Sequence, residues 1–176
     1  MKQSTTKDSL FFLAQLYKYS MKIDTIYLDM DGVIVDFLAG CKAINAWNGG
    51  YKVDWIKIHA AGPEFWAELP WTKEGEKFYY WLEKFCDEQG IELCILSQVG
   101  YQDGVTGKLE WIRNNCRVPN KNIYIVSKGK DKSKFANETS LLIDDFGKNV
   151  EAFIMAGGKA IKYNSAGQVK DELLDL

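Results

Sequence analysis

The apolar positions of the chain alternate between short continuous runs and longer stretches with helical spacing. The short runs predict five buried strands, over residues 23–30, 91–97, 122–127, 140–145 and 159–163. Helical spacing predicts helices over residues 73–89, 107–116 and 148–158, with a short helix near 132–137. This alternation is typical of an α/β fold with a doubly wound (Rossmann-like) parallel sheet and helices on both faces.

Two segments depart from this alternation. Residues 1–22 form an N-terminal extension in which residues 9–19 have the spacing of an amphipathic helix, although Met21 offers a second start. Residues 38–72 follow the first strand and are rich in aromatic residues, some of which should face a ligand. We interpret them as a small helical cap inserted into a core of residues 23–37 and 73–176.

Polar residues gather where the predicted strands end. They are Asp29 and Asp31, Ser97 and Gln98, a group of lysines, and Asp144 and Asp145. Because ligands bind open parallel sheets outside the carboxyl ends of the strands, these side chains should converge on one site. Carboxylates packed together need a cation, and oxygen ligands alone suit Mg²⁺. An EF-hand fits poorly, since its loop needs glycine at the sixth position and glutamate at the twelfth.

This set of side chains suits phosphoryl transfer. Asp29 can attack phosphorus and form an aspartyl-phosphate, while Mg²⁺ and a lysine offset the charge on the transferring group. Asp31 can protonate the leaving oxygen and then deprotonate the water that cleaves the intermediate. A dehalogenase is disfavoured, because a departing halide needs no proton.

Four segments resemble, in order, the four motifs of the haloacid dehalogenase superfamily. They are "DMDGVIVDF" (29–37), "ILSQ" (95–98), "KGKDKSK" (128–134) and "LLIDD" (141–145). The DxDG form is similar to that of the phosphatase branch. With the aromatic cap and "LLIDD", the chain more narrowly resembles the 5'(3')-deoxyribonucleotidases. The resemblance implies Mg²⁺-dependent hydrolysis of (deoxy)nucleoside monophosphates.

The resemblance also implies roles for the aspartates. Asp29 would be the nucleophile and Asp31 the general acid and base. Mg²⁺ would be bound by Asp29, the main-chain carbonyl of Asp31 and Asp145, with Asp144 beside them.

The substrate would be held by residues from several motifs. Ser97 and Gln98 would bind the phosphate. Phe37 would begin a pocket for the base, and Phe65 and Trp66 of the cap would stack on that base.

Four lysines of the third motif compete for the phosphate-binding role. Lys128, Lys130, Lys132 and Lys134 alternate with other residues. The family lysine lies at a helix start, and "DKSKFA" looks like one, which favours Lys132 with Lys134 second.

Composition narrows the class of partner. The length of 176 residues suggests one domain. The net charge of −2 argues against a broad surface for binding nucleic acid or an anionic membrane. The four cysteines form no CxxC pair and are expected to be buried and reduced, and His59 alone excludes a multi-histidine metal site. Without a transmembrane run or signal peptide, the cytoplasm is the expected location.

Several alternatives stay open at this stage. The substrate could be a sugar phosphate or another small phosphomonoester, or the chain could be a catalytically silent binding protein of the same fold. The sequence decides neither the base, the sugar, the 5' or 3' position of the phosphate, nor whether the chain forms a homodimer.

Overall fold

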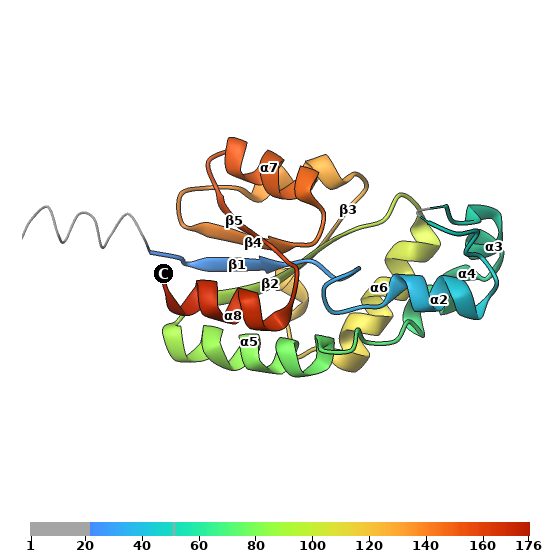
Figure 1. The fold of residues 1–176 in the computed structure, drawn as a ribbon, viewed down its shortest axis with the longest axis horizontal. Coiled ribbons are helices and arrows are strands. Elements are labelled where there is room, and N and C mark those ends of the chain that lie inside the picture. The colour runs from blue at the N-terminus through green and yellow to red at the C-terminus, as the bar shows by residue number, and fades with distance from the viewer. Residues whose placement is uncertain (1–21, 51) are drawn as a thin grey trace, which may run out of the picture.

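The computed structural model describes residues 22–50 and 52–176 (Figure 1). The amphipathic helix that we predict for residues 9–19 lies outside the described residues.

A five-stranded parallel sheet forms the centre of the fold. Its strands are β1 (Thr25–Leu28), β2 (Glu92–Gln98), β3 (Ile123–Val126), β4 (Ser140–Asp144) and β5 (Lys159–Lys162). Their order is β3-β2-β1-β4-β5, and all four neighbouring pairs are parallel. The predicted fold class is confirmed, and each predicted strand is present, in most cases shorter than its apolar run.

Helices cover both faces of this sheet. The elements are α5 (Gly75–Gln89), α6 (Gln102–Asn115), α7 (Gly147–Met155) and α8 (Ala166–Leu174). Helices α5 and α8 lie side by side below the sheet in Figure 1, and α7 lies above it. Successive strand residues point to opposite faces of the sheet. Leu141 and Ile143 therefore belong to the larger apolar core, and Leu142 belongs to a smaller one around Phe153.

Three details differ from the sequence-based prediction. Helix α6 begins at Gln102, earlier than predicted. The short helix predicted near 132–137 is a 3₁₀-helix, η2 (Gly129–Phe135). A shorter 3₁₀-helix, η1 (Asn120–Asn122), precedes β3. Helix α8 was not predicted. Its start carries a capping box between Ser165 and Gln168, a signal that the sequence does contain.

Three short helices fill the segment interpreted as a cap. They are α2 (Phe37–Ala43), α3 (Trp55–Ala60) and α4 (Gly62–Ala67), at one end of the molecule in Figure 1. Helix α4 packs closely on α6. A Cβ at Gly107 of α6 would lie 2.1 Å from the carbonyl oxygen of Pro63, so only glycine permits this approach.

The cysteines behave as expected. Cys41, Cys86, Cys94 and Cys116 are free and buried, and burial raises the pKa of Cys86 to about 12. Among residues 22–50 and 52–176, no helix has both the length and the apolar character to cross a membrane.

Candidate active site

A tight turn after β1 positions the first two aspartates. The carbonyl of Met30 accepts hydrogen bonds from the amides of Ile34 and Val35, at 2.9 and 2.8 Å. Gly32 has φ = +77°, and a Cβ there would lie 2.1 Å from Oδ2 of Asp145. Glycine is therefore required twice, for the backbone conformation and for the approach of β1 to the end of β4.

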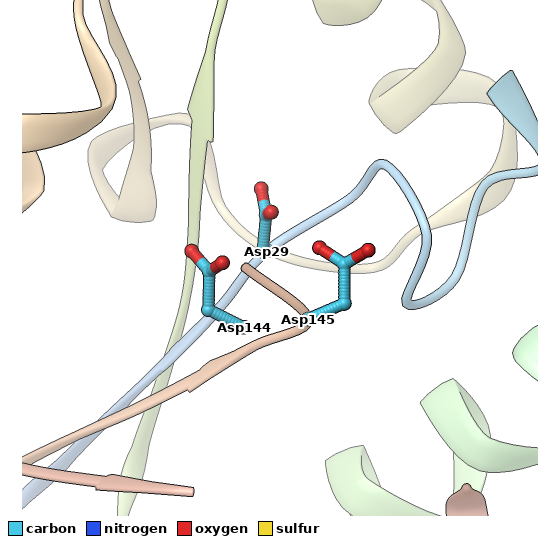
Figure 2. Close-up of side chains that lie close together, drawn as sticks. All are labelled: Asp29, Asp144 and Asp145. Carbon is cyan, nitrogen blue, oxygen red and sulfur yellow. The ribbon is translucent and has the colours of Figure 1, made fainter. Parts of the chain in front are cut away.

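Three carboxylates converge at the ends of β1 and β4. The side chains of Asp29, Asp144 and Asp145 point to the same space in Figure 2, and one oxygen of each lies within 4.8 Å of the others. Asp29 and Asp144 are buried and Asp145 is exposed. The structure thus brings these three residues, which the sequence analysis singled out, close together.

Lys132 enters this carboxylate cluster from η2. Its side chain is buried, with Nζ 2.8 Å from Oδ1 of Asp29 and 2.6 Å from Oδ2 of Asp144. Burial lowers the pKa of the lysine, but the two carboxylates outweigh it and hold the pKa above its usual value. Lys134 points elsewhere, since it is exposed and pairs with Asp131 at 2.9 Å. Of the lysine candidates, the structure brings Lys132 to the cluster.

Asp144 has its oxygens occupied by the protein. Oδ1 accepts from the amide of Phe146 at 2.9 Å, and Nδ2 of Asn149 donates to Oδ1 and Oδ2 at 3.2 and 3.1 Å. With Lys132 on Oδ2 as well, this carboxylate has little capacity left for another ligand. Its place favours a role in holding Lys132.

The Asp145 side chain, unlike that of Asp144, is exposed. Desolvation raises its pKa to about 7, with help from the charges of Asp29 and Asp144. A bound cation would relieve this repulsion between carboxylates. The side chains of Asp29 and Asp145 offer the oxygen atoms that Mg²⁺ prefers, so the residues present fit that ion.

Lys108 is a site residue that the sequence-based reasoning missed. This lysine of α6 is fully buried, forms an ion pair with Oδ2 of Asp31, and donates to Oγ of Ser97 at 2.8 Å. Its Nζ also lies 5.1 Å from the centre of the Trp66 ring. The helix spacing contained a signal, because Lys108 shares the buried face of α6 with Trp111 and Ile112.

Asp31 is placed for proton transfer. Burial raises the pKa of its carboxyl group, the Lys108 ammonium opposes that shift, and the negative charge of Asp29 adds to it. Its Oδ1 atom is buried without a hydrogen-bond partner. An unpartnered buried oxygen beside two charged groups is one that a substrate or proton can use.

Ser97 and Gln98 both lie at the end of β2 but differ in exposure. Ser97 is fully buried beside Lys108, whereas Gln98 is exposed. A Cβ at Gly129 would lie 3.2 Å from Oε1 of Gln98, so Gln98 adjoins η2.

The predicted aromatic residues of the pocket pack on one another. Phe37 stacks on Trp66 with ring centres 5.4 Å apart and meets Phe65 edge-on at 5.9 Å. Phe65 and Trp66 are only 7% and 3% exposed, so their rings offer little free surface for a base. Trp55 was not predicted to bind substrate, but it stacks on Phe37 at 6.0 Å and is 49% exposed.

Comparisons with known proteins bear on the fold. No family model matches the chain, and no curated protein matches it. A solved structure of a hydrolase from Streptococcus pneumoniae TIGR4 has a TM-score of 0.50 at 14% identity, covering 89% of this chain and 100% of that one. L-2-haloacid dehalogenase from Xanthobacter autotrophicus gives a TM-score of 0.48 at 12% identity, covering 87% and 83%. The chain is therefore similar in fold to a hydrolase.

Proposed function

We propose that this protein is a Mg²⁺-dependent phosphatase that hydrolyses (deoxy)nucleoside monophosphates through an aspartyl-phosphate. The observation that carries the proposal is the pairing of each candidate catalytic aspartate with its own buried lysine. Lys132 contacts Asp29, and Lys108 contacts Asp31. Such a site combines a nucleophile, a proton donor and fixed positive charge in a water-poor setting, as phosphate-ester hydrolysis requires.

The first step would use Asp29 and Asp31 together. A carboxylate oxygen of Asp29 attacks phosphorus, and the bond from phosphorus to the ester oxygen breaks. Asp31 gives its proton to that departing oxygen, and the alcohol leaves. The raised pKa of Asp31 supports this role, because the group must hold a proton near neutral pH.

The second step would restore the enzyme. Asp31, now a carboxylate, removes a proton from a water that attacks phosphorus. The bond from phosphorus to the Asp29 oxygen breaks, and inorganic phosphate leaves. Lys132 and Lys108 offset the negative charge throughout, and Ser97 is held by Lys108 where it can donate to a phosphate oxygen.

Asp29, Asp145 and the main-chain carbonyl of Asp31 would hold Mg²⁺. When bound, this ion supplies further positive charge for the transferring group. The saturated Asp144 would hold Lys132 instead of the metal.

The cap supports a nucleotide substrate. The stacked series Trp55, Phe37 and Trp66 runs from a half-exposed ring to the ring beside Lys108. A base could add to this series at Trp55. A sugar phosphate would need no such aromatic surface, which is why we favour the nucleotide.

The proposal is tested by phosphate release from a panel of nucleoside monophosphates, sugar phosphates and p-nitrophenyl phosphate, with the Asp29→Asn variant as control. We expect activity with Mg²⁺, none in EDTA, and a loss of at least about 1,000-fold in Asp29→Asn. A variant within tenfold of the wild type would remove Asp29 as the nucleophile. A preference for sugar phosphates would support the alternative substrate, and no turnover with any ester would favour a silent binding protein.

A further inference from the structure

Tyr101 connects the cap to the core of the fold. It follows β2 and directly precedes α6, which begins beside the cap in Figure 1. The centre of its ring lies 3.9 Å from that of the His59 ring in α3. Its hydroxyl accepts a hydrogen bond from Nε1 of Trp66 in α4, at 2.9 Å. One side chain of the core therefore contacts two helices of the cap.

The hydroxyl of Tyr101 matters because Trp66 is buried. Only 3% of Trp66 is exposed, and the indole N–H group can donate a hydrogen bond but not accept one. A buried donor that loses its acceptor is destabilised, because water cannot replace the missing partner. The Tyr101 hydroxyl therefore fixes the orientation of the Trp66 ring.

The Trp66 ring in turn contacts Lys108. The Nζ atom of Lys108 lies 5.1 Å from the centre of the ring, a distance typical of a cation–π contact. The same ammonium group donates to Oδ2 of Asp31 and to Oγ of Ser97. Because Lys108 is fully buried, these three neighbours and not water determine where its charge lies. A Trp66 ring that turned away would allow the ammonium group to shift.

We propose that Tyr101 is a positioning residue that acts on the site through Trp66 and Lys108. The Tyr101 hydroxyl orients the indole, and the indole fixes the ammonium group. The ammonium group then orients the proposed acid Asp31 and the proposed phosphate ligand Ser97. The expected effect on turnover rests on the proposed function, whereas the contacts themselves can be tested without any activity.

The contacts are tested by NMR of protein labelled with ¹³C at the lysine ε-carbons. Lys108→Met identifies the Lys108 signal, because that signal disappears. The ring current of Trp66 should displace this signal from those of exposed lysines. Tyr101→Phe removes only the hydroxyl, and we expect it to move the Lys108 signal toward the position of exposed lysines. Tyr80→Phe is the matched control, because the Tyr80 hydroxyl donates weakly to a carbonyl of α6 at 3.5 Å.

The effect on turnover is tested with p-nitrophenyl phosphate, which has no base for the cap to bind. We expect Tyr101→Phe to lower kcat/KM about 3- to 10-fold, the scale for one lost hydrogen bond. Tyr80→Phe should leave kcat/KM unchanged. In a Lys108→Met background, Tyr101→Phe should cause no further loss, because Tyr101 acts through Lys108.

Two results would overturn the proposal. The first is a Lys108 signal that stays in place in Tyr101→Phe. The second is an equal fractional loss of kcat/KM from Tyr101→Phe in the wild-type and Lys108→Met backgrounds, since Tyr101 would then only support the cap. If the wild type releases no phosphate from any ester, the proposed function fails instead. The NMR signal then still decides whether Tyr101 positions Lys108.

Discussion

The Nζ atom of Lys132 lies between two carboxylates, 2.8 Å from Oδ1 of Asp29 and 2.6 Å from Oδ2 of Asp144. Asp144 is itself fixed by Asn149 and by the amide of Phe146. Asp144 thus fixes the position of the Lys132 ammonium group, which also contacts the proposed nucleophile Asp29. This arrangement explains how a buried lysine keeps its charge.

Replacing Lys132 should therefore damage both turnover and stability. In Lys132→Met we expect kcat to fall about 10²- to 10³-fold, the scale for losing one donor to a developing negative charge. The free energy of unfolding should fall by about 3–5 kcal/mol, because two buried carboxylates lose their partner. Phosphate release and urea denaturation measure the two effects.

Lys134→Met is the matched control for this prediction. Lys134 lies two residues away on η2 but is exposed and contacts Asp131. Its replacement should change activity by less than about twofold, since exposed ion pairs contribute little. Equal losses in the two variants would show that Lys132 has no special place.

The metal-free protein should become less stable as pH rises. The folded-state pKa of Asp145 is about 7, above the value of about 3.9 in an unfolded chain. The folded state therefore binds this proton more tightly, and its stabilising effect is complete below pH 4 and lost as pH rises through 7. We expect the Tm in EDTA to fall between pH 5 and pH 8, and Mg²⁺ to restore it at pH 8.

Two substitutions locate this effect. Asp145→Asn should flatten the fall in Tm and abolish the response to Mg²⁺. Asp144→Asn should weaken the Mg²⁺ response less, because its oxygens are already bound by Lys132 and Asn149. If Asp144→Asn instead lost more of the Mg²⁺ response than Asp145→Asn, Asp144 would be the metal ligand and Asp145 would not.

Much of this site could be predicted because backbone topology determines it. Asp29, Ser97 and Asp144 end strands that the apolar runs mark clearly, and parallel strands bring those ends together. Lys132 was favoured because the resemblance places the family lysine at a helix start, although in the structure it lies in the last turn of η2. The convergence of the three strand-end residues needs only the chain order and the position of each strand end.

The remainder depends on packing between residues that are distant in the sequence. Lys108 occupies a helix face that otherwise reads as apolar, and its partners Asp31 and Ser97 lie 77 and 11 residues away in sequence. Phe65 and Trp66 were expected to stack on a base, but both are buried in the apolar core, where each contacts Phe37. Aromatic residues mark a cap equally well in both arrangements, so the sequence could not separate the two.

Removal of the Lys108 charge should shift the pH dependence of the reaction. The Lys108 ammonium opposes the burial that raises the pKa of Asp31. In Lys108→Met that pKa should rise further, so the basic limb of the kcat/KM profile, where Asp31 loses the proton that it must donate, should move to higher pH. Measuring kcat/KM from pH 5 to pH 9 checks this. A uniform loss at every pH would limit Lys108 to binding phosphate or holding Ser97.

The last prediction concerns the aromatic series of the cap. If the substrate is a nucleotide, the half-exposed Trp55 and its neighbour Phe37 should support the base, since Trp66 is almost completely buried. Stacking between a base and an aromatic ring is worth about 1–3 kcal/mol. We therefore expect Trp55→Ala and Phe37→Ala to lose about 5- to 150-fold in kcat/KM for nucleotides. p-Nitrophenyl phosphate should lose much less, because it has no base to position.

The comparison of the two substrates carries this test. A cap that merely lost its packing would lower both rates together, and Trp66→Ala should behave in that way because Trp66 contacts Phe37, Tyr101 and Lys108. Ile56→Ala is the matched control, since Ile56 adjoins Trp55 on α3 and is 82% exposed. Circular dichroism should confirm that each variant is folded. If neither Trp55→Ala nor Phe37→Ala impairs nucleotides selectively, the cap does not hold a base and a smaller phosphomonoester becomes the better substrate.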